Sequence, residues 1–209
     1  MHTALILIVI SLTLGSCIVS GDKYSNKFNT IYGCKQTVAV NNYNHAVEYI
    51  PTEYFEYTGT GTNSSFFRFG IVGPSDGVIR FSKVPMPYNK NVVHEIVLGL
   101  ANNQFTEIRR QTRFNAASFV NHQLTQIPTP NILSETEPFV FVIEFGKNGI
   151  VRLIRDGEKE PFVEFSDPTE EISFAYVGFS NWVAKVIYFF DCPVASFDLL
   201  VISNDLGIL

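Results

Sequence analysis

The sequence predicts an all-β fold, an antiparallel two-sheet β-sandwich of the jelly-roll or lectin-like kind. Phe, Val, Ile and Tyr occur in short runs separated by Gly, Pro and Asn, which favours pleated sheets over helices. Several runs alternate apolar and polar residues with a period of two, as half-buried strands require. No helical period is present between residues 129 and 193, where the strand and turn signals are densest.

Length and charge limit the number of domains and the kinds of partner that can be expected. The chain has 209 residues, and residues 22–209 are predicted to form a single domain large enough to bury a core. Its formal net charge is −5, with acidic and basic residues interspersed. Because no basic stripe exists to neutralise phosphates, we expect no nucleic-acid partner.

The first residues are typical of a secretory signal peptide. The segment Ala4 to Leu14 is a short apolar run, followed by the smaller residues of a cleavage zone. We assign residues 1–21 to the signal and predict a secreted, extracellular protein without stable membrane insertion. A signal anchor, and a bacterial lipoprotein box at Leu14 to Cys17, are the alternative interpretations.

Two cysteines then remain, and they predict one disulfide, between Cys34 and Cys192. Their Cα atoms are expected about 4.4–6.8 Å apart. The alternative is a pair of buried free thiols. Asn63 begins the acceptor sequence Asn-Ser-Ser in a predicted loop, so N-glycosylation is expected there.

The first half of the domain contains four predicted strands. Thr37 to Val40 is the first, and Glu48 to Tyr57, interrupted by Pro51, is the second. Phe66 to Val72 and Val78 to Ser82 follow and alternate with a period of two.

The second half continues with Val92 to Gly99 and Phe105 to Arg110. Ala116 to Gln126 is compatible with a short helix or a loop. Turn signals Asn148-Gly149 and Asp156-Gly157 then divide a β-meander. Its predicted strands, with the two that follow, are Phe139 to Phe145, Ile150 to Arg155, Phe162 to Phe165, Ile172 to Phe179 and Val183 to Phe190.

Cofactor and metal motifs are weak. Gly59-Thr60-Gly61 has the spacing of a dinucleotide or methyl-donor turn, but a strand follows where such a site needs a helix. The histidines of the domain lie in unrelated segments without metal-ligand spacing, and His94 and Glu95 point to opposite faces of one strand. We therefore predict no cofactor, no metal and no catalytic residues.

A ligand site is predicted from three residues, Asn103, Arg109 and Trp182, which we expect to meet at one end of the sandwich. A ring with flanking hydrogen-bonding groups would hold a sugar or a planar apolar ligand. Each residue has another interpretation: Asn103 and Arg109 as loop and edge polar residues, and Trp182 as a cap on the core. The basic run Arg109 to Arg113 is a modest anion site or, as the pattern favours, a charged sheet edge.

Several ordered segments resemble the farnesoic acid O-methyltransferase domain of arthropod proteins. The resemblance covers about residues 64–190, although Leu100-Ala101 replaces the usual Gly-Trp and Trp is missing from Phe139 to Phe145. It implies methyl transfer from S-adenosylmethionine to farnesoic acid in juvenile-hormone-type synthesis. The segments are Phe67 to Phe69, Asp76 to Ser82, Glu95 to Gly99, Asn103, Ile108-Arg109, Thr129 to Ser134, Phe139 to Phe165, Asp167-Pro168, Tyr176 to Gly178 and Trp182.

A methyl-donor pocket is usually built at the strand-to-helix turns of an α/β sheet, and this sequence has no βαβ rhythm. We therefore expect an extracellular binding or recognition module for a glycan, a secreted protein or a small apolar molecule. Two alternatives remain: the S-adenosylmethionine-dependent methyltransferase that the resemblance implies, and a structural secreted protein without a small ligand.

Overall fold

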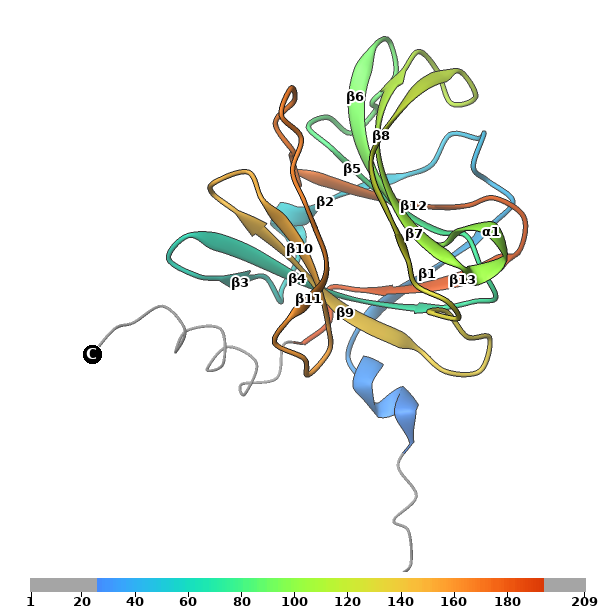
Figure 1. Ribbon diagram of the computed structural model, residues 1–209, viewed down its shortest axis with the longest axis vertical. Coiled ribbons are helices and arrows are strands. Elements are labelled where there is room, and N and C mark those ends of the chain that lie inside the picture. The colour runs from blue at the N-terminus through green and yellow to red at the C-terminus, as the bar shows by residue number, and fades with distance from the viewer. Residues whose placement is uncertain (1–25, 194–209) are drawn as a thin grey trace, which may run out of the picture.

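The computed structural model describes residues 26–193, and the predicted signal peptide, residues 1–21, lies outside them. Two antiparallel sheets pack face to face (Figure 1), which confirms the predicted β-sandwich. One sheet has the order β1-β13-β4-β9-β10-β11 with β3 also paired to β4, and the other has the order β2-β12-β5-β6-β7-β8. Among the described residues, no helix has the length and apolar character needed to cross a membrane.

Strand bounds define the two sheets. The seven-stranded sheet contains β1 (Lys35–Val40), β3 (Gly59–Thr60), β4 (Ser64–Val72), β9 (Phe139–Gly146), β10 (Val151–Arg155), β11 (Pro161–Phe165) and β13 (Lys185–Phe190). The six-stranded sheet contains β2 (Tyr49–Pro51), β5 (Gly77–Ser82), β6 (Asn91–Gly99), β7 (Phe105–Arg113), β8 (Phe119–Pro128) and β12 (Tyr176–Asn181). Three short helical turns are η1 (Lys27–Ile31), η2 (Thr52–Tyr54) and α1 (Leu100–Asn103).

Three segments differ from their sequence-based expectation. Residues 116–126, left open between helix and loop, contribute most of β8, the edge strand of the six-stranded sheet. The predicted strand from Glu48 to Tyr57 is limited to β2, because the chain turns into η2 after Pro51. Residues 166–175 carry the chain from β11 in one sheet to β12 in the other, so the strand expected from Ile172 starts only at Tyr176.

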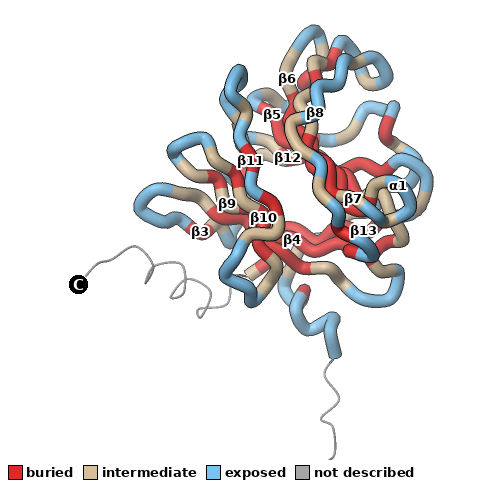
Figure 2. Tube along the Cα trace, viewed as in Figure 1, coloured by how far each residue is buried: buried red, intermediate tan, exposed pale blue. Residues whose placement is uncertain are grey.

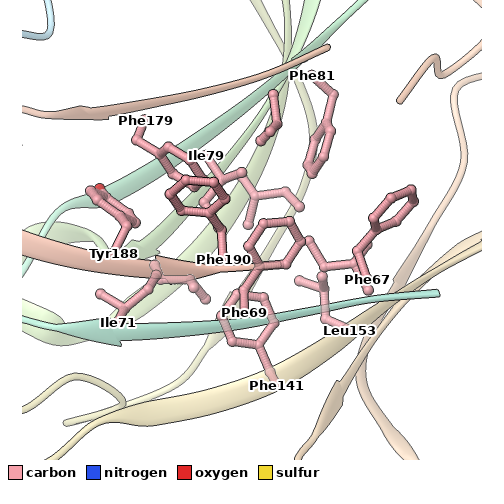
Figure 3. Close-up of a cluster of buried hydrophobic side chains, with 14 of the residues drawn as sticks. Phe67, Phe69, Ile71, Ile79, Phe81, Phe141, Leu153, Phe179, Tyr188 and Phe190 are labelled. Atoms are coloured by element: carbon pink, nitrogen blue, oxygen red, sulfur yellow. The ribbon is translucent and has the colours of Figure 1, made fainter. Parts of the chain in front are cut away.

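The core lies between the sheets and is dominated by phenylalanine. Alternation along β4 turns Phe67, Phe69 and Ile71 toward the other sheet, where they meet side chains of β5 and β12 (Figure 3). Phe69 is fully buried and packs near the rings of Phe81, Phe141 and Phe179 at centroid distances of 6.1–6.4 Å. Each such ring removed from water contributes about 1.5–3 kcal/mol. In Figure 2 the buried residues accordingly follow the strands, and the exposed residues gather in the loops.

The two ends of the domain are held together. Cys34 and Cys192 form the predicted disulfide just beyond the β1–β13 pair, with their Cα atoms 4.1 Å apart, slightly closer than expected. Beside it, Arg68 donates hydrogen bonds to the carbonyl oxygens of Thr30 and Pro193, at 2.8 and 3.2 Å. The same guanidinium pairs with Asp156, so one side chain joins both ends of the described chain, residues 26–193, to the meander.

Candidate functional site on the outer face of the six-stranded sheet

The outer face of the six-stranded sheet carries a buried polar network. Along β6, His94 points between the sheets and Glu95 points outward, as their adjacent positions predict. Arg80 on β5 lies opposite Glu95, and its Nε donates to Glu95 Oε1 at 2.9 Å. Both side chains are almost completely buried, at 1% and 0% exposure. Burial disfavours the charged guanidinium, but Glu95 more than offsets this and raises the pKa of Arg80.

Tyr43 covers this ion pair. It comes from the loop between β1 and β2, and its hydroxyl donates to Glu95 Oε2 at 2.8 Å. Arg80 lies over its ring, 4.6 Å from the centroid, and donates to its carbonyl oxygen. Burial first, and then the charge of Glu95, raise the pKa of Tyr43 to about 12. The phenol therefore stays protonated at neutral pH and holds the loop in place as a donor.

The next strand extends the network. Gln111 on β7 donates through Nε2 to the Tyr43 hydroxyl at 2.8 Å and to Asn121 Oδ1 on β8 at 2.7 Å. Arg109 pairs with Glu107 on its own strand and reaches Glu95 Oε2 at 3.5 Å. Burial opposes its charge, yet these carboxylates raise the pKa of Arg109.

The basic run Arg109 to Arg113 suggested a charged sheet edge, and this prediction is wrong. β7 is an interior strand between β6 and β8, and Arg113 is fully buried with its guanidinium over the ring of Phe119. Burial, together with the nearby charge of Arg80, lowers the pKa of Arg113. The sequence pattern failed here because β8, the strand that covers this edge, was not recognised.

A pocket of about 310 Å³ opens beside the network, and we call it the Trp182 pocket. Trp182 follows β12, is 45% exposed, and lies with its ring centroid 4.0 Å from that of Tyr43. Val78 and Val97 pair across β5 and β6 and provide an apolar floor. The lining residues are Tyr43, Asp76, Val78, Val97, Leu100, Arg109, Asn121 and Trp182.

The polar atoms of the Trp182 pocket retain hydrogen-bonding capacity. Asp76 accepts from Ser75 through Oδ2 only, at 2.7 Å. Asn121 accepts from Gln111 through Oδ1, so its Nδ2 donors turn away from that bond. Within the described residues, Arg109 Nη2, Asn121 Nδ2, Asp76 Oδ1 and Trp182 Nε1 have no hydrogen-bond partner. An aromatic face, an apolar floor and free donors and acceptors thus share one pocket.

Two of the three predicted ligand residues, Arg109 and Trp182, line this pocket, and Asn103 does not. The chain adopts positive φ angles from Ala101 to Asn103, and the Asn103 amide is taken up by the backbone of the 129–134 segment. Its Nδ2 donates to the carbonyl oxygen of Leu133 at 2.8 Å, and its Oδ1 accepts from the Leu133 amide at 3.1 Å.

Sequence reasoning missed Tyr43, Asp76 and Asn121 as pocket residues. Tyr43 lies in a loop without a motif, Asp76 appeared only at the start of a segment of the family resemblance, and Asn121 fell in the segment of uncertain structure. Only the pairing of distant strands brings them together. The predicted glycosylation residue Asn63 is exposed in the loop that precedes β4.

A second polar cluster lies between the sheets, where His94 Nε2 is 2.9 Å from Asp167 Oδ2. Arg110 donates to Asp167 Oδ1 at 2.7 Å and also bonds Thr169. Burial opposes ionisation of Asp167, but hydrogen bonds from Thr169, His94 and Arg110 together hold its pKa well below the usual range. Burial lowers the pKa of His94 despite Asp167, so the ring is neutral at pH 7. The cluster fastens the 166–175 crossing to β6 and β7.

Fold and pocket together define an antiparallel two-sheet β-sandwich with a pocket on the outer face of one sheet. Within that class, the chain belongs to the farnesoic acid O-methyl transferase family, whose model matches residues 43–194. This confirms the resemblance of the sequence motifs. None of the curated proteins compared with the chain matches it.

Solved structures with a similar fold include a galectin, a carbohydrate-binding module and the binding domain of a neurotoxin. The galectin LEC-6 of Caenorhabditis elegans is 11% identical with a TM-score of 0.41, over 74% of this chain and 94% of the galectin. The carbohydrate-binding module CBM66 of Bacillus subtilis is 13% identical with a TM-score of 0.38, over 73% of this chain and 91% of the module. The binding domain of botulinum neurotoxin DC, solved with rat synaptotagmin II, is 15% identical with a TM-score of 0.35, over 84% of this chain and 48% of the other.

Proposed function

We propose that this protein is an extracellular recognition module that binds a glycan in the Trp182 pocket. The observation that carries the proposal is the exposed Trp182 ring beside free donors and acceptors on a rigid floor. A sugar ring presents apolar C–H groups on its face and hydroxyl groups on its rim. An indole face stacks against the former, and fixed polar groups pair with the latter.

Preorganisation supports the same proposal. Glu95, Tyr43 and Gln111 form a closed set of hydrogen bonds below the pocket, and Gln111 fixes the orientation of the Asn121 amide. Binding groups that are already held in place lose little conformational entropy when a ligand arrives. A pocket that is built on sheet strands in this way suits recognition of a polar ligand of defined shape.

The experiment is a glycan array on the secreted mature protein, followed by calorimetry on the best glycan. Trp182→Ala is expected to weaken binding at least tenfold and to leave the thermal transition nearly unchanged, because the indole is 45% exposed. Val183→Ala is the matched control, since Val183 is adjacent and 69% exposed but does not line the pocket. Equal binding by Trp182→Ala and the unmodified protein would disprove the proposal.

Methyl transfer is the second candidate function, favoured by the family match alone. It would require the chain to bind S-adenosylmethionine, a ligand with an adenosine ring and a charged sulfonium group. Calorimetric titration of S-adenosylmethionine, followed by a methyl-transfer assay on farnesoic acid, separates the two functions. We expect no saturable heat; micromolar binding with product formation would replace the recognition function by the enzymatic one.

Secretion and glycosylation complete the proposal. Residues 1–21 direct export, and Asn63 accepts an N-linked glycan. Asn63 is exposed next to the first residue of β4, whereas Asp76 of the Trp182 pocket lies beyond the other end of that strand, directly before β5. A glycan on Asn63 would therefore lie away from the pocket. A mass shift that glycosidase treatment removes, and that Asn63→Gln abolishes, is expected for the protein secreted from eukaryotic cells.

A further inference from the structure

Tyr43 connects the stacking face of the Trp182 pocket to its hydrogen-bond donors. Its backbone N–H donates to the carbonyl oxygen of Asn181, the residue before Trp182, at 3.0 Å, and its ring centroid lies 4.0 Å from that of the indole. Its hydroxyl accepts from Arg109 Nη1 at 3.3 Å and from Gln111 Nε2 at 2.8 Å. One tyrosine side chain therefore spans the distance between the indole and the guanidinium.

The other polar groups of the pocket lie close to these residues. Gln111, which donates to the Tyr43 hydroxyl, also donates to Asn121 Oδ1 at 2.7 Å, so Asn121 is two hydrogen bonds away from that hydroxyl. The side chain of Asn181 donates to the carbonyl oxygen of Asp76 at 3.3 Å, which holds Asp76 at the indole side of the pocket. A pyranose ring with its hydroxyl groups is about as wide as a tyrosine side chain is long. The stacking face and the free donors are therefore within reach of the same ring.

One aromatic ring of this pocket is open to a ligand. Trp182 and Tyr43 are the aromatic residues that line it within the described part of the chain. Trp182 is 45% exposed, whereas Tyr43 is 2% exposed, with Arg80 4.6 Å from its ring centroid. An exposed indole face stacks against one face of one sugar ring. The volume of about 310 Å³ also lies at the small end of the range that is typical of ligand pockets.

We infer that the Trp182 pocket binds one sugar ring at a time, a single monosaccharide unit, with the remainder of the glycan outside the pocket. This inference rests on the proposed function and specifies the size of its ligand. Trp182 stacks on the apolar face of the ring, and Arg109 Nη2 and Asn121 Nδ2 donate to hydroxyl oxygens of the same ring. Tyr43 sets this size, because it fixes the indole at the length of one phenol side chain from the guanidinium.

Titrations that follow the fluorescence of Trp182, the sole tryptophan of the sequence, test the inference. The probes are the methyl glycosides of glucose, galactose, mannose, N-acetylglucosamine, fucose and sialic acid, each compared with a linear tetrasaccharide of the same unit. For a unit that binds, the two dissociation constants are expected to agree within about fivefold, since four equivalent rings give only a statistical advantage. A larger gain for the tetrasaccharide would overturn the inference.

Asn121→Ala tests whether the indole and the amide hold the same ring. Asn121 is exposed, so the variant is expected to fold normally and to bind the methyl glycoside about threefold to tenfold more weakly, by the loss of one hydrogen bond. The control is Gln123→Ala, because Gln123 is exposed on the same strand but outside the pocket lining.

The outcomes separate this inference from the proposed function. Unchanged affinity of Asn121→Ala for the methyl glycoside would overturn the inference and keep the proposed function, whether or not tetrasaccharide binding falls, because the amide would then not hold the ring that stacks on Trp182. A fluorescence that none of these probes changes, together with a glycan array without a bound glycan, would refute both.

Discussion

The two faces of the six-stranded sheet are built from alternating residues of the same strands, and different interactions stabilise them. On the inner face, Ile79, Ile96 and Ile108 pack into the aromatic core, and their cohesion depends on volume. On the outer face, Arg80, Glu95 and Arg109 are held by hydrogen bonds and ion pairs, and their cohesion depends on charge. One residue along the chain separates the two environments. The comparison predicts that removing a charge on the outer face lowers the free energy of unfolding much more than a small change of side-chain volume on the inner face does.

Loss of charge on the outer face is expected to have the largest effect. Glu95→Gln conserves shape but leaves Arg80 buried without a carboxylate partner, so we expect a loss of about 3–5 kcal/mol in the free energy of unfolding. Urea unfolding at pH 7.5 measures it. Glu164→Gln is the control, because its partner Arg152 is a surface residue and the expected loss is below about 1 kcal/mol. Similar midpoints for both variants would show that the outer network is not a stability element.

Acidification tests His94, a titrating group on the inner face. Burial lowers the pKa of His94, so the unfolded chain takes up its proton first, near pH 6.5. The stabilising contribution of neutral His94 is therefore complete above that pH and is lost as the pH falls. The slope is at most about 1.4 kcal/mol per pH unit for one proton. Urea unfolding between pH 7.5 and 5 should show this slope.

Two variants test whether His94 causes the loss of stability at low pH. His94→Gln cannot titrate and should flatten the slope, whereas His122→Gln, at an exposed position on β8, should retain it. An unchanged slope in His94→Gln would place the sensitivity elsewhere. Because the buried ring becomes charged at low pH, the hydrogen-exchange protection factors of residues 166–175, which the His94–Asp167 contact fastens, are expected to fall.

A change of shape on the inner face is expected to have the smallest effect. Ile96→Val removes one methylene next to Glu95 and should cost about 0.5–1.5 kcal/mol, by the transfer and cavity terms of a core truncation. Thermal unfolding monitored by circular dichroism suffices to measure it. A cost that equals that of Glu95→Gln would remove the distinction between the two faces.

The inner face could be predicted from sequence and much of the outer face could not. Period-two alternation alone predicts that Ile79 and Phe81 lie in the core, because a strand with one buried face repeats every second residue. Alternation says only that Arg80 and Glu95 face away from the core. It says nothing about Tyr43, which reaches them from a loop nearly forty residues upstream of Arg80. Long-range strand pairing creates the pocket, and it leaves no local pattern.

Cys34, Cys192 and Arg68, which we call the clasp, hold the two ends of the described chain together at one place on the domain. Cys192 follows the end of β13, whereas Trp182 precedes its start, so the strand spans the distance between clasp and pocket. Whatever is attached through either end of the described chain therefore pulls on the same point, across from the pocket. Immobilised by a terminal tag, the domain would present the Trp182 side outward, and a pulling force would load the covalent clasp before it reached the sheets.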